Sequence, residues 1–294
     1  DLVECPKYLY RYRSFDDKKI ECLGDRSLQV ETWKKEVFEG RVMPTCPLYF
    51  NDPYDCDFCI DQKTLQSKFA KSTIIENLKP IFEKLKIETI TEKEIENLHN
   101  SSNTEETVEE ILKTRGCNLK MPLLDVFCNG LKSKIDDLKK GLTVVCFTED
   151  VKSILMWSHY ANNHRGFCIE YKLAQTDLSK QIRKVIYSSE RHYLRDEDLN
   201  EKGIFRPTLY KSDVWKYEKE WRYVTANFPW VISKNEKRFS MDFSKYISGI
   251  YLGTNTPEDK EKEVIKFCFK KNIPVYKMKM KYDTYALEPQ KIDN

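Results

Sequence analysis

KSDVWKYEKEWRYVT, at residues 211–225, places aromatic rings, two neighbouring carboxylates and several cations in one short segment. Its centre is typical of a loop that continues into a strand over residues 220–225. Because residues two apart in an extended chain share a face, we expect Glu218 and Glu220 to point the same way. Two like charges on one face are costly unless a cation lies near them, and Arg222 falls on that face. The segment predicts either a charged rim beside an aromatic strand, or a polar site that stabilises positive charge or binds a polar substrate.

The composition is that of a globular protein rather than a disordered one. Of 294 residues, 40% are hydrophobic and 33% are charged, and this length allows one large domain or two small ones. Lys and Arg exceed Asp and Glu by 50 − 47 = 3, so net charge argues neither for nor against nucleic acid as a partner. No apolar run approaches the roughly 18 residues of a membrane span. We therefore expect no membrane partner, and we expect no secretory signal.

Ten cysteines are scattered along the chain. Cys146 and Cys168 lie in apolar, strand-like runs, where a free thiol behaves as a small hydrophobe. Cys56 and Cys59 have the spacing of a metal or redox pair. Neither Cys46 nor the four histidines supply a second pair at a usual distance. We predict buried thiols in a reducing cytoplasm, and no metal site.

The first predicted strand is LYRYRS, residues 9–14. Its alternation puts Tyr10 and Tyr12 on one face and Arg11 and Arg13 on the other. One face can therefore pack while the other offers guanidinium groups.

A helix, a short strand and a turn are predicted after this first strand. Residues 27–40 have the apolar spacing of a helix that begins at a serine cap and ends at a glycine, and residues 41–47 predict a short strand. YFNDPYD, residues 49–55, predicts a turn because Asn and Asp bond their own backbone and the Asp-Pro step disfavours helix. Asp52 and Asp55 are also candidate polar site residues.

Residues 61–140 differ from the rest of the chain in composition and in hydrophobic pattern. They are rich in Lys, Glu, Leu and Ile and show little strand-like alternation. TEKE at 91–94 predicts a capping box, and residues 103–106 predict another helix start. We predict an insertion of about four helices, whose Lys/Glu runs are solvated faces and which is a candidate for contact with a partner. Residues 1–60 and 141–294 then form the core domain.

Strand patterns return in the second half of the chain. LTVVCFT, residues 142–148, is a nearly continuous apolar run, which implies burial on both faces. A short helix capped by Asp150 is expected to turn one side inward, formed by Val151, Ile154, Leu155 and Ser158. Further strands are expected at 167–172, 182–188, 238–243, 247–253 and 274–281, and a helix at 256–271. Strands, a helical insertion and more strands predict an α+β fold with a mixed, largely antiparallel sheet.

Common glycine-rich and catalytic motifs are absent from the sequence. With nine glycines in the chain, phosphate binding would fall to arginine side chains or helix N-termini. Ser158, His159, Tyr160 and His164 share one segment. His159 is either an acid–base group or a residue at the edge of the core, and Tyr160 either packs or stacks on a flat ring.

Four stretches in this order resemble a bacterial family known as domain of unknown function 2971. They are LYRYRS, YFNDPYD, MWSHYANNHRGFCIEY at 156–171 and KSDVWKYEKEWRYV at 211–224. The resemblance spans nearly the whole chain outside the helical insertion, and MWSHYANNHRGFCIEY and WKYEKEWR are its most specific parts. The family name implies no activity.

A second, more distant resemblance is to ADP-ribosyltransferases. These enzymes carry an Arg or His on the first core strand, a Ser or Tyr at a middle strand, and a late Glu, which in one branch is Glu-x-Glu. The matching residues here are Arg11 or Arg13, Ser158 or Tyr160, and Glu218 with Glu220. The middle element departs from the Ser-Thr-Ser pattern of that branch. The resemblance implies a split sheet, NAD as substrate, a protein or nucleic-acid acceptor, and a role as a toxin or phage-defence effector.

The same resemblance implies a role for each residue. An arginine would hold the NAD pyrophosphate or nicotinamide ribose by charge-assisted bonds. Ser158, His159 and Tyr160 would also bind NAD, with an aromatic ring stacked on nicotinamide. Glu220 would bond a ribose hydroxyl and stabilise an oxocarbenium-like transition state. Glu218 would orient or deprotonate the acceptor.

Two alternatives remain open from the residues themselves. One is a metal-dependent nuclease that uses Asp52, Asp55, Glu170 and Glu220; magnesium-dependent cleavage lost in Asp55→Asn would favour it. The other is a non-catalytic module whose aromatic segments bind a ligand or partner, in which case truncating Glu220 changes binding without any turnover to lose.

Overall fold

The computed structural model describes most of the chain as two compact units. The described residues are 3–16, 18–23, 26–118, 122–198, 206–226 and 241–293, with the backbone alone described for 18–23, 26–31, 126, 131–138 and 226. Unit 1 comprises residues 1–49, 142–187 and 213–294, and unit 2 comprises residues 50–141 and 188–212. Unit 2 therefore contains the expected helical insertion, together with residues 50–60, 141 and 188–212, which the sequence analysis assigned to the core domain.

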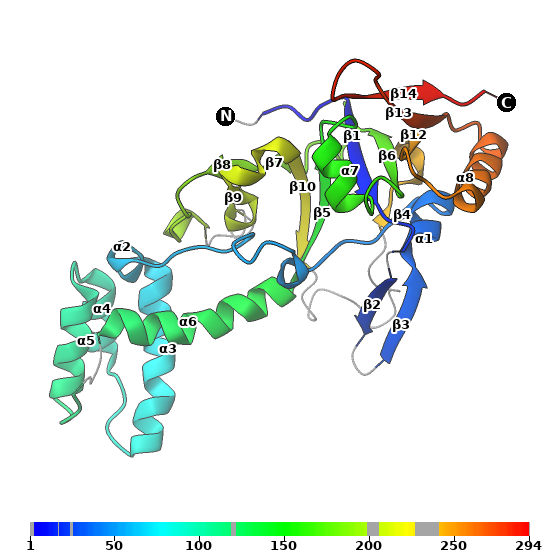
Figure 1. Cartoon of the computed structure of the whole chain (residues 1–294). Coiled ribbons are helices and arrows are strands. Elements are labelled where there is room, and N and C mark those ends of the chain that lie inside the picture. The colour runs from blue at the N-terminus through cyan, green and yellow to red at the C-terminus, as the bar shows by residue number, and fades with distance from the viewer. Residues whose placement is uncertain are drawn as a thin grey trace. The chain divides into compact units, whose positions relative to one another are not determined.

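An eight-stranded sheet forms the centre of unit 1, in the order β14-β13-β12-β6-β1-β5-β10-β7 (Figure 1). Its strands are β1 (Tyr8–Arg13), β5 (Leu142–Thr148), β6 (Phe167–Lys172), β7 (Ile182–Lys184), β10 (Glu220–Ala226), β12 (Ile247–Leu252), β13 (Val275–Met280) and β14 (Leu287–Lys291). β12 and β13 run parallel, whereas the other neighbouring strands of this sheet run antiparallel. The α+β class and the mixed, largely antiparallel sheet are thus confirmed. The finer expectation of a split sheet differs from this continuous one.

A pair of strands lies between β1 and the first helix of unit 1. β2 (Lys18–Leu23) and β3 (Arg26–Glu31) pair antiparallel, and α1 (Thr32–Phe38) follows directly. The helix predicted over 27–40 is therefore wrong in its first half. Residues 26–31 bond to a neighbouring strand, and a pattern read along one segment does not reveal such a partner.

Smaller differences follow from local backbone geometry. β4 (Arg41–Val42) is shorter than predicted and pairs with β11 (Met241–Asp242), while Pro47 opens the 3-10 turn η1 (Pro47–Tyr49). The expected strand at 182–188 is interrupted between β7 and β8 (Ile186–Ser188). Of the expected strand at 238–243, residues 238–240 lie outside the described residues.

Helix α7 (Ile154–Tyr160) turns a different side inward from the predicted one. Ser153, not Asp150, caps it by accepting a bond from the Met156 N–H. Ile154 and Leu155 are exposed, whereas Met156 and Trp157 are buried. The Trp157 ring packs edge-on against Tyr12 of β1, with centroids 5.0 Å apart. The side of α7 that is buried is therefore the one that packs against the sheet.

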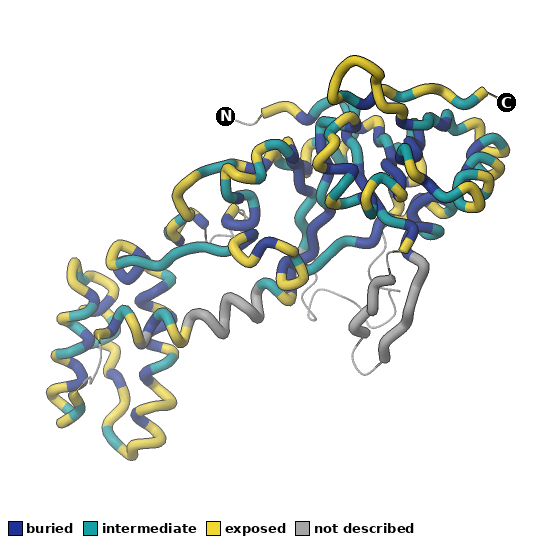
Figure 2. The backbone as a smooth tube through the Cα atoms, viewed as in Figure 1, coloured by how far each residue is buried: buried dark blue, intermediate teal, exposed yellow. Residues whose placement is uncertain are grey.

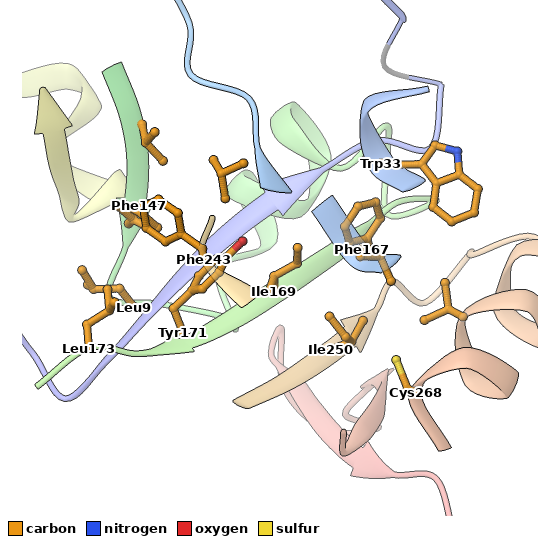
Figure 3. Packing of buried hydrophobic residues seen from close by; sticks show 14 of the residues in the cluster. Leu9, Trp33, Phe147, Phe167, Ile169, Tyr171, Leu173, Phe243, Ile250 and Cys268 are labelled. Carbon is orange, nitrogen blue, oxygen red and sulfur yellow. The ribbon is translucent and has the colours of Figure 1, made fainter. Parts of the chain in front are cut away.

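The two faces of the sheet enter different hydrophobic cores. We name them after a buried tryptophan on each. The Trp33 face packs against α1 and α8 (Glu258–Lys270), and its core includes Leu9, Trp33, Phe147, Ile169, Tyr171, Ile250 and Cys268 (Figure 3). The Trp157 face packs against α7, and its core includes Tyr12, Met156, Trp157, Cys168, Tyr251, Met278 and Leu287. Burial of alternate residues on both faces confirms the expectation for β5, which is buried along almost its whole length.

Unit 2 is built mainly of helices. They are α2 (Gln62–Leu65), α3 (Lys68–Leu85), α4 (Glu92–Asn100), α5 (Thr104–Lys113) and α6 (Leu123–Lys140). Residues 188–212 add the 3-10 turns η2 (Asp196–Asp198) and η3 (Arg206–Leu209) and the strand β9 (Tyr210–Ser212). Buried and exposed residues alternate along α3, α4 and α5, as expected of helices with one solvated face (Figure 2). The capping box of Thr91 with Glu94 and the N-cap Asn103 are confirmed.

None of the helices that the structure describes is long and apolar enough to cross a membrane. The cysteines in the described part of the chain are free thiols, and Cys5, Cys56, Cys168 and Cys268 are buried.

Candidate functional site

The segment that carries Glu218 and Glu220 folds as a turn followed by a strand. The 3-10 turn η4 (Asp213–Glu218) ends at Glu218, Lys219 adopts a left-handed φ of 46°, and β10 begins at Glu220. The strand is confirmed at its predicted start. The premise of an extended chain through Glu218 is wrong, because the left-handed residue reverses the local alternation. The two carboxylates are therefore held by separate contacts.

Glu220 is held by an arginine on its own strand. Its side chain is buried, and Arg222 donates from Nε to Oε1 at 2.8 Å and from Nη2 to Oε2 at 2.9 Å. A fork-to-fork pair of this kind fixes orientation as well as charge. The expected pairing of Glu220 with Arg222 is present. Burial, followed by the charge of Glu220, raises the pKa of the neighbouring Cys146 thiol.

Glu218 is held by a tyrosine of α7. The Tyr160 hydroxyl donates to Glu218 Oε1 at 2.6 Å, and Glu218 is buried. The ring of Tyr217 lies 6.4 Å from that of His159, which is exposed. The η4 turn and α7 thus bring Glu218, Tyr160, His159 and Tyr217 together. Tyr160 and Glu218 are 58 positions apart in the sequence.

A row of polar residues crosses the Trp157 face of the sheet. Strand pairing aligns Glu170 with Tyr10, Tyr10 with Thr148, and Thr148 with Glu220. Cross-strand partners point to the same face, and Tyr10 shares its face with Tyr12 of the Trp157 core. At a strand spacing of about 4.8 Å, the Cα atoms of Glu170 and Glu220 lie about 14 Å apart. Both carboxylates therefore belong to one face.

Glu170 accepts hydrogen bonds from three hydroxyl groups. Tyr251 and Tyr10 donate to Oε2 at 2.8 and 3.2 Å, and Ser248 donates to Oε1 at 2.7 Å. The rings of Tyr251 and Tyr276 stack with centroids 4.6 Å apart. Burial first, and then bonding to Glu170, raises the pKa of Tyr251, so this tyrosine stays a neutral donor. Tyr251 and Ser248 were missed from the sequence. The usable signal was a glutamate inside the apolar strand FCIEY.

The turn after α7 has an unusual backbone. Asn162, Asn163 and His164 all have positive φ, of 45°, 54° and 65°. Non-glycine residues in this region carry strain that surrounding contacts must hold in place. His164 Nε2 lies 3.2 Å from Ser158 Oγ, which also donates to the Ile154 carbonyl. Burial lowers the pKa of His164. Ser158 is therefore engaged within its own helix and turn.

Gly166 ends this turn against the first strand. A Cβ at Gly166 would lie 2.1 Å from the Arg13 carbonyl oxygen. At this distance the position of residue 166 has room only for the hydrogen of a glycine and not for a Cβ atom. This explains why glycine stands between the strained turn and β6.

Arg11 and Arg13 lie on the opposite, Trp33 face. Both are buried against Glu36 of α1: Arg13 Nε lies 3.0 Å from Oε2 and Arg11 Nη2 lies 3.6 Å from Oε1. Arg13 Nη2 also donates to Thr32 Oγ1 at 3.0 Å. The alternation was predicted correctly, but this face is covered rather than open. The structure does not bring Arg11 and Arg13 together with Tyr160, Glu218 and Glu220.

Asp52 and Asp55 belong to unit 2. Asp52 Oδ1 accepts a bond from the Tyr54 N–H at 2.9 Å, as expected of a turn, and Asp55 pairs with Lys211 at 3.3 Å. Within the described ranges, no three His, Cys, Asp or Glu side chains come together as potential metal ligands. Trp221 of β10 is buried in the Trp33 core.

Comparison with known proteins gives one match. A family model described as protein of unknown function (DUF2971) matches residues 156–223. This stretch contains most of α7, all of β6 and η4, and the start of β10. It therefore includes MWSHYANNHRGFCIEY and WKYEKEWR, the most specific parts of the sequence resemblance. LYRYRS and YFNDPYD lie outside it. No curated protein and no solved structure matches the chain.

Proposed function

We propose that this chain is an NAD-dependent ADP-ribosyltransferase-like enzyme whose catalytic carboxylates are Glu218 and Glu220. The observation that carries the proposal is a pair of buried carboxylates two residues apart, one fixed by Arg222 and the other bonded to Tyr160 at 2.6 Å. Two carboxylates in different environments can take different roles in one reaction. Both lie within the stretch that matches the family model.

The proposed reaction breaks the bond between nicotinamide and ribose. Nicotinamide leaves with the bonding electron pair, and the ribose carbon gains oxocarbenium character. Glu220 would accept a bond from a ribose hydroxyl and stabilise that positive charge. Glu218 would take the proton of the acceptor as its nucleophilic atom bonds to the ribose carbon.

Aromatic side chains would bind the nicotinamide ring. His159, Tyr160 and Tyr217 stand next to one another beside Glu218, and flat rings stack on such side chains. In the proposal Arg11 and Arg13 hold the sheet to α1 instead of binding NAD, because both are buried against Glu36. Ser158 supports the turn that carries His164 rather than contacting the cofactor.

The wider biology of the proposal rests on the sequence resemblance. In the proposal the protein is a cytoplasmic bacterial toxin or phage-defence effector, its acceptor is a protein or a nucleic acid, and the helical unit contacts a partner. The chemistry at Glu218 and Glu220 can be tested before any acceptor is known, since nicotinamide is released whichever acceptor reacts.

The test measures nicotinamide release from NAD, with candidate protein and nucleic-acid acceptors present or absent. We expect Glu220→Gln and Glu218→Gln each to slow release about 100-fold or more. Glu258→Gln, at an exposed site on α8, is the matched control and should react as the unaltered chain does. Binding of NAD without turnover would instead favour a ligand-binding module. The proposal fails if the unaltered chain neither releases nicotinamide nor binds NAD.

A further inference from the structure

A pocket of about 280 Å³ lies within unit 2, which holds none of the residues proposed for catalysis. Its walls come from Tyr54 and Asp57, from residues 188–192 and from β9. Serine hydroxyls, aromatic rings and charges of both signs therefore meet in one cavity.

The charges around this pocket favour a ligand without a net charge. Arg191 pairs with Asp57, so this guanidinium has no full charge to offer an anion. The Lys211 ammonium is matched in the same way by Asp55, at 3.3 Å. Glu190 also lines the pocket, and no cation in the described part of the chain pairs with its carboxylate, which would repel an anion. Because Glu190 is exposed, water screens its attraction for a cation.

His192 is fixed in orientation and leaves one ring nitrogen for a ligand. Its Nε2 lies 2.8 Å from Oδ2 of Asp198, which is fully buried, and its ring stacks on Tyr210 with centroids 4.0 Å apart. The Cys59 N–H donates to the His192 carbonyl at 2.7 Å. An ionised carboxylate only accepts, so in the neutral imidazole the proton is on Nε2 and Nδ1 is an acceptor. Among the described residues, none hydrogen-bonds to this Nδ1.

Hydroxyl groups stand beside these acceptors. Ser188, Ser189 and Ser212 line the pocket, and Ser188 Oγ accepts a bond from the Glu190 N–H at 3.0 Å. Within the described ranges, no residue bonds to the hydroxyls of Ser189 and Ser212. A hydroxyl both donates and accepts. The pocket therefore offers a single ligand donors from serine, and acceptors from His192 Nδ1 and Glu190.

We propose that this pocket binds a neutral ring that carries neighbouring hydroxyl groups, as a free sugar or the ribose of a nucleoside does. Such hydroxyls give their protons to His192 Nδ1 and the Glu190 carboxylate, and accept bonds from the serines. The apolar side of the ring, or an attached base, packs on Tyr54, which is 60% exposed. The volume lies just below the range usual for small-molecule pockets, about 300–1,000 Å³, and suits a ligand smaller than a dinucleotide.

The proposal is tested by NMR titration of the full chain, followed at the ring nitrogens of its four histidines. The probes are D-ribose, D-glucose, adenosine and 2′,3′-dideoxyadenosine, which lacks the neighbouring hydroxyls. We expect at least one of the first three to bind with a Kd below about 10 mM and to shift the Nδ1 signal of His192. Binding of adenosine alone would identify a nucleoside, whereas comparable binding of ribose or glucose would identify a free sugar. Where adenosine binds, dideoxyadenosine should bind about tenfold more weakly.

A variant at an exposed position keeps the test independent of folding. Glu190→Ala removes an acceptor from the pocket without disturbing a core, and should weaken binding about tenfold. Glu96→Ala, at an exposed position on α4, deletes a carboxylate elsewhere in unit 2 and should leave the Kd unchanged. Any one of four results overturns the proposal: no probe binds with a Kd below about 10 mM, the shift falls on His159 or His164 instead of His192, dideoxyadenosine binds as tightly as adenosine, or Glu190→Ala binds like the unaltered chain.

Discussion

Glu36 should be among the residues on which the stability of unit 1 depends most. Its side chain is fully buried on α1 and meets two buried arginines of β1, with Arg13 Nε at 3.0 Å and Arg11 Nη2 at 3.6 Å. The Met43 N–H also donates to Glu36 Oε1 at 3.4 Å. Glu36→Gln keeps the size of the side chain but removes the charge that both guanidinium groups face.

The expected loss follows from what remains in the core. Arg11 keeps its bonds to the carbonyl groups of Cys146 and Met43, and Arg13 keeps its bond to Thr32. These neutral acceptors do not balance two buried positive charges. Removing one partner of a buried ion pair costs about 3–5 kcal/mol. We expect the free energy of unfolding of unit 1 to fall by this amount, and its melting temperature to fall on the order of 10 °C.

Tryptophan fluorescence isolates the relevant unit. The tryptophans that the structure describes, at positions 33, 157, 215 and 221, lie in unit 1, and the sequence of unit 2 contains none. Denaturant unfolding followed by selective tryptophan excitation therefore reports unit 1 even if unit 2 unfolds separately. The matched control is Glu39→Gln, which neutralises an exposed carboxylate beside Arg41 at 3.9 Å. It should change the unfolding free energy by less than about 1 kcal/mol. Equal losses in Glu36→Gln and Glu39→Gln would refute the assignment of a structural role to this cluster.

Two further predictions concern other charged pairs. Arg222→Met removes both hydrogen bonds that Arg222 gives to the buried Glu220 carboxylate, so the free energy of unfolding, followed by tryptophan fluorescence, should fall by about 3–5 kcal/mol. The double variant Arg222→Met with Glu220→Leu should recover most of this stability. A double variant as unstable as Arg222→Met alone would contradict the prediction. In unit 2, hydrogen bonding to Arg115 holds the pKa of Glu94 at about 2, below its ordinary value of 4.5. Because the folded-state pKa is depressed, this stabilisation is present above about pH 4.5 and is lost as pH falls towards 2. Glu94→Gln should flatten the loss of helical circular dichroism in that window, and an unchanged acid profile would count against the pairing.

Much of the sheet follows from local sequence. β1, β5, β6, β12 and β13 lie close to where apolar alternation or an apolar run predicts them. The caps at Thr91 and Asn103 also follow from the sequence, because an N-cap bonds a backbone N–H only two or three residues away. These features depend on neighbours along the chain, and so the amino-acid order is sufficient to find them.

Other features depend on partners that are distant in the chain. Residues 26–31 form a strand because β2 pairs with them, and α7 buries Trp157 rather than Leu155 because β1 presents Tyr12. Neither the pairing strand nor the receiving ring is visible in the periodicity of the segment itself.

The candidate site shows the same division. The sequence by itself determined that Arg11 and Arg13 share a face, since this follows from strand spacing. The same argument failed for Glu218 and Glu220, because Glu218 lies in a 3-10 turn and Lys219 is left-handed. Only the tertiary structure decided that Glu36 covers the arginines, and that Tyr160 and Arg222 hold one carboxylate each. Spacing along a strand fixes which side chains share a face. What covers that face is fixed by elements packed from elsewhere in the chain, because burying apolar surface, and not local propensity, brings them together.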